Sequence, residues 1–191
     1  METTEISSAR SKQIVDAAKE LFGEKGIART SVKDITEKAG ITRSLFYHYF
    51  NDKEAVTNAV LDGYVQGFVD AVKEWNENRV TGDVAGALRD CVDMFTSLLL
   101  ERDTFRQLLL KPENAALYLR FSQQSADALA RYLTDTTARD YAAMHDMQIE
   151  NVYDTFYLLI FGLVGYVRQN PEAPKEVIAD LIAKTLHLDL G

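Results

Sequence analysis

The sequence predicts an all-α protein. Only three prolines and ten glycines interrupt its 191 residues, so long stretches carry no helix breaker. Apolar residues recur at three- and four-residue spacing, and the alternation typical of strands is nowhere sustained. With 47% apolar and 26% charged residues, the composition is that of an ordinary globular protein. We expect about nine helices, divided between a small domain at 1–52 and a larger one at 53–191.

The first helix is predicted to begin near residues 8–11 and to run to about Lys25, where Gly26 ends it. The residues before it, 1–7, are polar and are expected to fray. The apolar face of this helix consists of residues at helical spacing, namely Ile14, Ala17, Ala18, Leu21 and Phe22.

Two short helices separated by a glycine are predicted next. Ser31 with Asp34 three residues later forms a capping-box pattern, which favours a helix start. Gly40 can adopt the left-handed conformation that ends a helix, and Thr42 is expected to cap the helix after it. The spacing therefore predicts a helix, a tight turn and a second helix within about twenty residues.

The stretch 41–53 is hard to explain as scaffold alone. It places four aromatic residues within five positions, close to basic side chains. Phe46 and Phe50 share one helix face, which leaves Tyr47 and His48 pointing elsewhere. A tyrosine can pack with one edge of its ring and offer a hydrogen bond to phosphate with its hydroxyl. A helix, a turn and a second helix that starts with hydroxyls and an arginine are typical of a helix-turn-helix motif.

The rest of the chain is predicted as helices separated by polar turns or prolines. Asn51 and Glu54 form a second capping-box pattern, which opens a long helix reaching the break at 76–83. The segment 134–146 either extends the helix before it or forms a loop with a helical turn. The remaining helices are expected at 84–101, 104–110, from 114, at 147–170 and from 175.

The helix expected at 147–170 is apolar on most of its circumference and must be covered on two sides. Its own domain can cover one side and a second copy of the protein the other. Gly162 and Gly165 would let another helix approach closely. The alternative, a core helix of a monomer, is less favoured because so small a domain has few other helices to surround it.

A specific pattern extends over residues 12–56. It consists of Ile14, Ala17, Ala18, Leu21, Phe22, Gly26, Thr30–Ile35, Ala39–Thr42, Leu45–Phe50, Lys53 and Glu54. In this pattern the chain resembles the TetR (tetracycline-repressor) family of transcriptional regulators. Thr36 departs from the alanine usual there, and Ser44 from a common glycine.

The resemblance implies a DNA-binding domain at 1–52 and a helical effector-binding and dimerisation domain at 53–191. It further implies a homodimer in which the last two predicted helices pair with their mates in a four-helix bundle. The expected interface residues are Phe156, Ile160, Gly162, Leu163, Val167, Ile178, Leu181 and Ile182. The expected function is repression of transcription from a palindromic double-stranded DNA operator, released by a small-molecule effector.

DNA contacts are expected from Ser31, Lys33, Thr42, Arg43, Ser44, Tyr47, His48 and Lys53. Arg43 is the expected base reader, because a guanidinium can bind guanine through two hydrogen bonds, worth about 1 to 3 kcal/mol of discrimination. The residues expected to hold phosphate, helped by backbone amides at helix starts, are Tyr47, His48, Ser31 and Lys53. The competing interpretations are a solvated charge for Lys33 and Arg43, and a packed core ring for Tyr47.

Aromatic residues are numerous enough to line an effector pocket, with nine tyrosines and nine phenylalanines in the chain. The candidates are Tyr64, Phe68, Trp75, Phe95, Phe121, Gln124, Tyr153 and Tyr157. For any one of them, a place in an ordinary core is the competing interpretation. We expect no cofactor and no metal.

The net charge of −8 is unevenly distributed. Residues 1–53 hold nine Lys or Arg and eight Asp or Glu, a net of +1, whereas 54–191 hold twelve and twenty-one, a net of −9. With a nearly neutral DNA-binding region and an acidic remainder, the protein should bind random DNA weakly. Sequence specificity should then depend on a few well-positioned contacts.

Two other classes of protein compete with a regulator. An enzyme finds little support, since the three histidines are scattered and no phosphate loop or nucleophile elbow occurs; Asp140, His145, Asp146 and Glu150 form at most a weak acidic cluster. A sensor that has lost tight DNA binding would suit the acidic balance. The single cysteine, Cys91, excludes an internal disulfide. With neither signal peptide nor membrane span expected, we expect a cytoplasmic protein.

Overall fold

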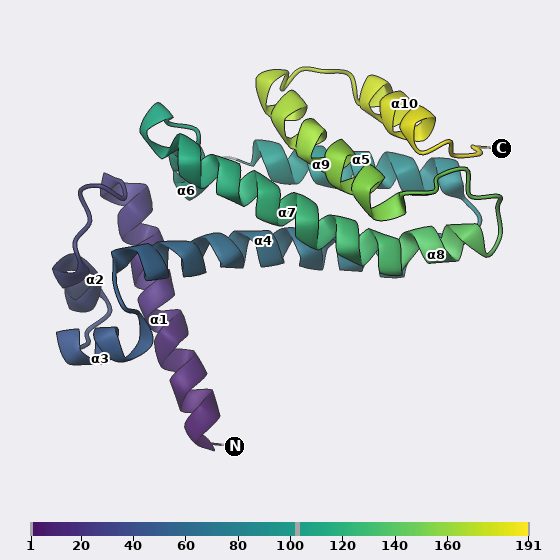
Figure 1. The fold of residues 1–191 in the computed structure, drawn as a ribbon. Coiled ribbons are helices and arrows are strands. Elements are labelled where there is room, and N and C mark those ends of the chain that lie inside the picture. The colour runs from purple at the N-terminus through teal and green to yellow at the C-terminus, as the bar shows by residue number, and fades with distance from the viewer. Residues whose placement is uncertain (1, 102–103, 191) are drawn as a thin grey trace. The chain divides into compact units, whose positions relative to one another are not determined.

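The computed structural model describes residues 2–101 and 104–190, and these contain helices and no strand (Figure 1). The all-α prediction is confirmed. Within the described residues there are ten α-helices and one 3-10 turn: α1 Glu2–Lys25, α2 Val32–Lys38, α3 Arg43–Tyr49, α4 Lys53–Asn78, α5 Val84–Leu100, α6 Thr104–Leu109, η1 Pro112–Asn114, α7 Ala115–Asp135, α8 Thr137–Ala142, α9 Val152–Gln169 and α10 Lys175–Thr185.

The chain forms two compact units. The first unit comprises Met1–Tyr64 with Arg102–Tyr118, and the second comprises Val65–Glu101 with Leu119–Gly191. The expected boundary after residue 52 coincides with the start of α4. The first compact unit also contains the start of α4, up to Tyr64. It contains α6 as well, because α6 packs against α1.

The first unit has a core of large apolar side chains from α1 to α4 and α6. The fully buried members include Ile14, Phe22, Ile35, Phe46, Val56 and Phe105. The rings of Tyr64 and Phe105 stack with centroids 5.0 Å apart, and Phe22 contacts Phe105 from α1 at 6.3 Å. Stacked aromatic rings bury much area for few residues, and here they join α1, α4 and α6.

The helix starts follow local capping, with two corrections. Ser31 and Thr42 cap α2 and α3 as predicted. Asn51 does not cap α4: the carboxylate of Asp52 accepts from the amide of Ala55 at 2.8 Å, so the helix begins at Lys53. The first helix begins at Glu2 rather than near residues 8–11, because no glycine or proline precedes Gly23 to stop it.

The second unit combines the rest of α4 with α5 and with α7 to α10. Both α9 and α10 pack on α5, and Phe68 meets Phe121 edge-on with centroids 5.7 Å apart. Segment 134–146 contains the separate short helix α8. None of the described helices has the length and hydropathy of a membrane-spanning segment.

The helix predicted at 147–170 begins only at Val152. The residues before it alternate polar and apolar, and the side chain of Gln148 donates to the carboxylate of Asp146. Met147 and Ile149 both line the cavity described below. An irregular, extended stretch turns alternate side chains to one side, and here this arrangement replaces the first helical turn.

Gly40 offers a direct test of the turn between α2 and α3. Its φ of +62° is left-handed, and a Cβ built on it would meet nothing within 4 Å. Only the backbone therefore opposes a side chain, and Gly40→Ala should lower the free energy of unfolding by about 1 kcal/mol. Thermal unfolding measures this. Gly63→Ala, in open space within a helix, is the control and should stabilise the protein; equal effects at both sites would contradict the backbone argument.

Candidate nucleic-acid interface and cavity

The turn between α2 and α3 is held by a complete set of backbone hydrogen bonds. The amide of Gly40 donates to the carbonyl of Glu37 at 3.2 Å, and the amide of Ile41 donates to the carbonyl of Thr36 at 3.0 Å. These two bonds form a Schellman motif. Gln13 of α1 donates to the carbonyl of Ala39 at 2.7 Å. The end of α2 is therefore fixed both by its own backbone and by α1.

The helix α3 has one buried and one exposed face. Phe46 is fully buried and contacts Phe50 with ring centroids 5.9 Å apart. The opposite face consists of exposed residues at i, i+1, i+4 and i+5: Arg43, Ser44, Tyr47 and His48. We call these four residues the α3 surface. Tyr47 is 48% exposed and its ring meets Phe46 edge-on, so it is not a core residue.

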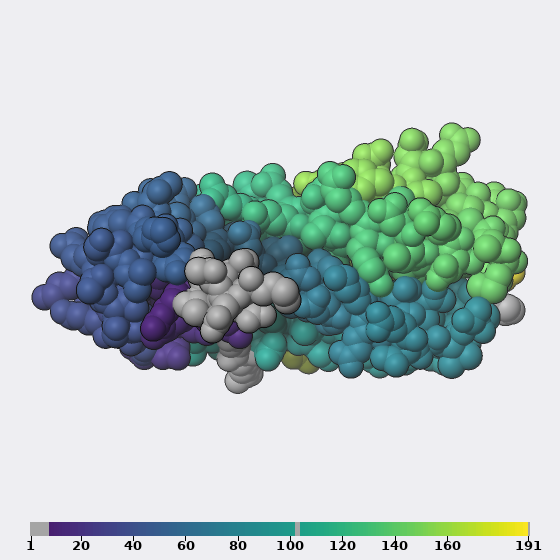
Figure 2. Space-filling view, turned by 90° about the horizontal axis from the view of Figure 1, so that it is seen from below, coloured from purple at the N-terminus to yellow at the C-terminus, as the bar shows by residue number. Residues whose placement is uncertain are grey.

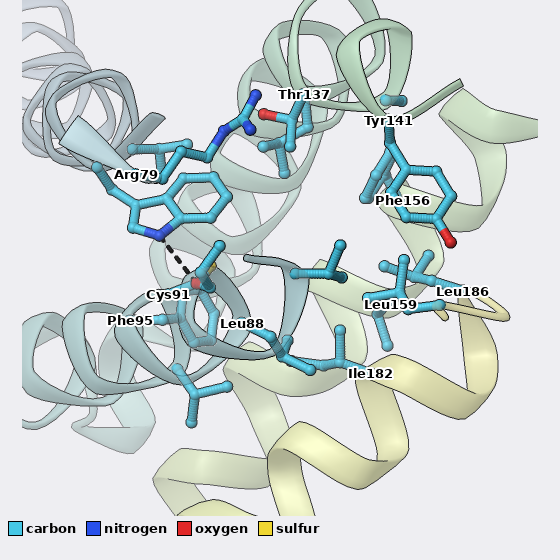
Figure 3. A pocket seen from close by; sticks show the side chains of 18 of the residues that line it. Arg79, Leu88, Cys91, Phe95, Thr137, Tyr141, Phe156, Leu159, Ile182 and Leu186 are labelled. Atoms are coloured by element: carbon cyan, nitrogen blue, oxygen red, sulfur yellow. Dashed lines mark hydrogen bonds between the residues drawn. The ribbon is translucent and has the colours of Figure 1, made fainter. Parts of the chain in front are cut away.

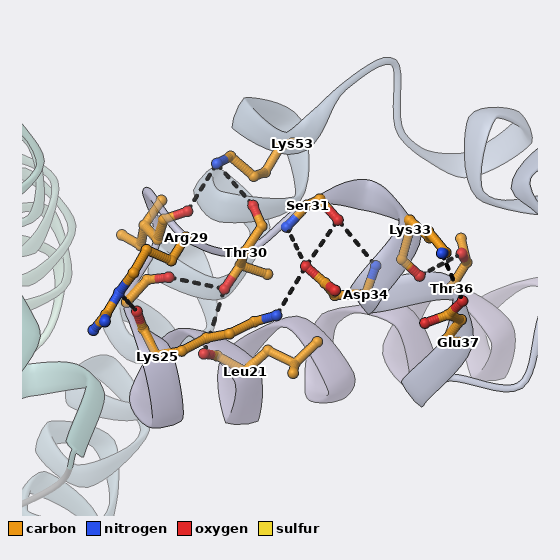
Figure 4. Close-up of polar contacts among 12 residues, drawn as sticks. Leu21, Lys25, Arg29, Thr30, Ser31, Lys33, Asp34, Thr36, Glu37 and Lys53 are labelled. Carbon is orange, nitrogen blue, oxygen red and sulfur yellow. Dashed lines mark hydrogen bonds and ion pairs between the residues drawn. The ribbon is translucent and has the colours of Figure 1, made fainter.

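Ser31 and Asp34 form the capping box at the start of α2 (Figure 4). The Asp34 carboxylate accepts from the amide and the hydroxyl of Ser31 at 2.7 and 2.8 Å, and it lies 2.8 Å from the Lys25 ammonium. Lys33 is exposed and lies 3.6 Å from Glu37. The Ser31 hydroxyl is held by the hydrogen bonds of the helix cap, whereas the Lys33 ammonium has only a weak ion pair at the surface.

Lys53 joins the start of α4 to the turn before α2 (Figure 4). Its ammonium donates to the carbonyls of Ile27 and Thr30 at 2.7 and 2.9 Å. The hydroxyl of Thr30 donates to the carbonyl of Gly26 at 2.8 Å, which closes the same turn. An ammonium has three donors, so one N–H of Lys53 remains beyond these two bonds.

The second unit contains an apolar cavity of about 170 Å³ that is partly open to solvent (Figure 3). Its wall combines side chains from α4, α5 and α7 to α10, and the labelled members include Leu88, Cys91, Phe95, Phe156, Leu159, Ile182 and Leu186. The Trp75 indole lies at the wall and donates to the carbonyl of Ala87 at 3.0 Å. Burial raises the pKa of the Cys91 thiol to about 12, which disfavours the reactive thiolate form.

A polar cluster lies where α4 ends beside α7 and α8. Arg79 donates to Asn76 at 2.8 Å and to Asp140 at 2.6 Å, and Thr137 donates to the same Asn76 oxygen at 2.8 Å. Figure 2 shows this part of α4 and the turn after it beside the surface of α7 and α8. In Figure 3 Arg79 and Thr137 lie together at one side of the cavity.

These features match known proteins. The family described as bacterial regulatory proteins, tetR family, matches residues 14–60. The uncharacterized HTH-type transcriptional regulator YvdT of Bacillus subtilis is 34% identical over 182 residues, covering 94% of this chain and 78% of YvdT. The chain belongs to the TetR family of transcriptional regulators.

Other TetR-family proteins agree over parts of the chain. The HTH-type transcriptional regulator TtgR of Pseudomonas putida is 33% identical over 105 residues, so the match spans 54% of this chain and half the length of TtgR (50%). The structure of the TetR family repressor AlkX from Dietzia covers 95% of this chain and 97% of AlkX at a TM-score of 0.67 and 16% identity. That likeness shows the fold.

Two of the eight effector candidates of this TetR-family chain, Trp75 and Phe95, line the cavity. The other six lie elsewhere. Tyr64 stacks on Phe105, the Phe68–Phe121 pair is core, and Gln124 is half-buried in α7. The Tyr153 hydroxyl donates to Asp127 at 2.6 Å and Tyr157 stacks on Phe161.

Sequence reasoning missed most of the cavity wall. It favoured aromatic residues, whereas the wall is mainly aliphatic. The sequence signal for this wall was an apolar face of α5 with Leu88, Cys91 and Phe95 at helical spacing. Two members of the weak acidic cluster have other contacts: Asp140 binds Arg79 and His145 stacks on Tyr141.

Most residues expected at the dimer interface face inward. Ile160, Leu163, Val167 and Ile178 are buried within the protomer, and Phe156 and Ile182 belong to the cavity wall. Gly162 and Leu181 are exposed. Periodicity correctly predicted two apolar helices there, but it could not tell which of their faces packs on α5.

Asp34 makes the first unit sensitive to acid. The Lys25 ammonium, aided by the two bonds from Ser31, holds the pKa of this carboxyl well below its usual range. A depressed pKa stabilises the fold above the unfolded-state value of about 3.9, and this stabilisation is lost as the pH falls through the folded value. The first unit should therefore lose stability in acid.

We expect Asp34→Asn to lower the melting temperature at neutral pH and to flatten its decline on acidification. Thermal unfolding between about pH 7 and pH 3 measures both effects. Asp16→Asn, on the exposed side of α1, is the control and should keep the wild-type slope. An unchanged slope in Asp34→Asn would show that another carboxylate controls the acid response.

Proposed function

We propose that this TetR-family chain is a homodimeric transcriptional repressor that leaves a palindromic operator when a small molecule enters its cavity. The observation that carries the proposal is the α3 surface, where Arg43, Ser44, Tyr47 and His48 stand exposed on a helix whose other face is core. A recognition helix must hold its place while presenting side chains to the major groove. Such a protein acts on DNA in the cytoplasm and needs no catalysis.

The side chains of the α3 surface have different parts in this proposal. The Arg43 guanidinium is exposed and has no hydrogen bond or ion pair with the described residues, so it can bind a guanine edge. Tyr47 and His48 can donate to phosphate. Ser44 can contact either a base or the backbone.

The flanking residues position this surface. Thr42 accepts from the amide of Leu45 at 3.2 Å as the cap of α3, and its hydroxyl hydrogen can still donate to phosphate. Lys53 has one donor left for phosphate beyond the two carbonyls that it binds. Ser31 and Lys33 lie at the start of α2, where Lys33 offers the more available group.

The outer faces of α9 and α10 support a homodimer. Leu158 is 68% exposed and Tyr166 39% exposed on α9, while Val177 and Leu181 are 43% and 44% exposed on α10. Cβ atoms built at Gly162 and Gly165 would meet nothing within 4 Å, which leaves room for a second helix. An exposed apolar stripe on two adjacent segments is typical of a protein interface.

An effector can release the dimer from DNA by changing which dimer conformation is most populated. Two helix-turn-helix heads bind successive major grooves only when they are about 34 to 36 Å apart. A ligand that binds better to a dimer with another spacing shifts the population away from the DNA-binding form. The cavity in the second unit is the proposed place for that ligand.

Selection of DNA from random fragments at about 0.15 M salt tests the DNA interface. We expect a near-palindrome with half-sites about one helical turn apart. Arg43→Ala should change the preferred base at one position of each half-site, whereas Tyr47→Ala should weaken binding about equally across sequences. Recovery of no sequence by the wild-type protein, with or without candidate ligands, would favour the sensor that does not bind DNA.

The dimer can be tested by the mass in solution. Wild-type protein should have twice the 21.5 kDa chain mass, and Leu158→Glu should give the monomer because a carboxylate would be buried without a partner. Leu119→Glu, on α7 with 48% exposure, is the matched control and should remain a dimer. Light scattering at micromolar concentration measures both, and a dimeric Leu158→Glu variant would exclude this stripe.

A further inference from the structure

The lining of the cavity in the second unit restricts the chemistry of its ligand. We propose that the effector is an uncharged, mainly apolar molecule, and not an organic acid or amine. The regulatory consequence of this inference rests on the proposed function; ligand binding itself does not.

The wall offers an almost continuous hydrocarbon surface. Leu88, Phe95, Phe156, Leu159 and Ile182 surround the space from three helices (Figure 3). A cavity of about 170 Å³ is large enough for a small ligand, and apolar cavities of this size take up apolar molecules. The favourable term for a ligand is therefore the apolar area that it removes from water.

The permanently charged residues among the described lining are Arg79 and Asp83. The Arg79 guanidinium binds the carboxylate of Asp140 at 2.6 Å and the amide oxygen of Asn76 at 2.8 Å. Asp83 accepts from the amide of Gly86 at 2.7 Å as the cap of α5. A ligand carboxylate would have to share Arg79 with Asp140, which already neutralises it, and a ligand ammonium would have to share the carboxylate that caps α5.

The uncharged polar groups of the wall also have partners. The Trp75 indole donates to the carbonyl of Ala87, and the Thr137 hydroxyl donates to Asn76. The Tyr141 hydroxyl accepts from the amide of Asp189 at 3.0 Å, and its ring stacks on His145 with centroids 4.5 Å apart. These bonds hold the wall together and leave at most a hydroxyl hydrogen or an imidazole edge for a ligand.

Burial of an ion without a counter-charge is costly, because the ion loses its hydration and gains no partner. A neutral molecule of the same shape keeps the hydrophobic gain and avoids that cost. His145 is the lining group that could provide a charge for an acid, and it is therefore included in the test.

Three probes of the same length separate the classes: 1-octanol, octanoate and octylammonium, each titrated calorimetrically into the full chain near pH 7.5, where the last two are charged. We expect 1-octanol to bind with a dissociation constant at least about tenfold lower than that of either ion. Octanoate or octylammonium binding as tightly as 1-octanol would overturn the proposal, and so would a failure of 1-octanol to bind.

Substitutions at Cys91 place the binding in the cavity. Cys91→Phe should fill the space and remove 1-octanol binding, whereas Cys91→Ala keeps the space open and should retain it. Unchanged 1-octanol binding in folded Cys91→Phe would overturn the assignment to this cavity. If Cys91→Phe does not fold, the comparison of the three probes on the wild-type protein still decides the class. Octanoate binding that His145→Gln abolishes would identify an acid site and reject the neutral class.

Selection of DNA with the same preparation separates the two proposals. Preferred binding of 1-octanol without enrichment of any DNA would retain the ligand class and reject the repressor. Enrichment of a palindrome together with equal binding of 1-octanol and octanoate would retain the repressor and reject the ligand class.

Discussion

The arrangement of the first unit depends on how the Lys53 ammonium satisfies two carbonyls of the turn before α2. The carbonyls of Ile27 and Thr30 point toward the start of α4 and accept from Lys53 at 2.7 and 2.9 Å. Without that side chain, two partly buried acceptors would lack their partner, which is more costly than a lost surface contact. The bond connects segments 23 and 26 residues apart, so it fixes α2 relative to α4 and thereby positions α3.

Backbone and core contacts at a few positions are enough to hold the α3 surface in place. The Schellman turn at Gly40 holds one end of α2, and the capping box with the Lys25 ion pair holds the other. Phe46 then anchors α3 through complete burial. Each support involves backbone groups or a buried ring, so the exposed side chains of α3 could change without loss of the scaffold.

Local signals in the sequence predicted much of the first unit because its helix ends are set by neighbouring residues. Ser31, Gly40 and Thr42 have the roles that their types and spacing favour. The cap of α4 was misassigned because Asn51 and Asp52 are both good caps, and only the bond from Ala55 to Asp52 distinguishes them.

The second unit was harder to predict because periodicity shows that a helix has apolar faces without showing what each face contacts. In α9, Ile160 and Leu163 are spaced much like Leu158 and Gly162, but the first pair is buried and the second exposed. The cavity depends on side chains from six helices, and no local pattern reports that they meet. The aromatic content suggested a pocket, yet aliphatic residues form most of its wall.

The two faces of α9 connect the cavity with the proposed dimer interface. Phe156, Leu159 and Leu163 border the cavity, while Leu158 and Tyr166 stand on the outer side of the same helix. Helices in a close-packed interior move largely as rigid bodies, so a ligand that displaces the inner face also displaces the outer stripe. In the proposed homodimer a single helix would couple the affinity of a ligand to the geometry of the interface, and linkage requires that such a coupling act equally in both directions.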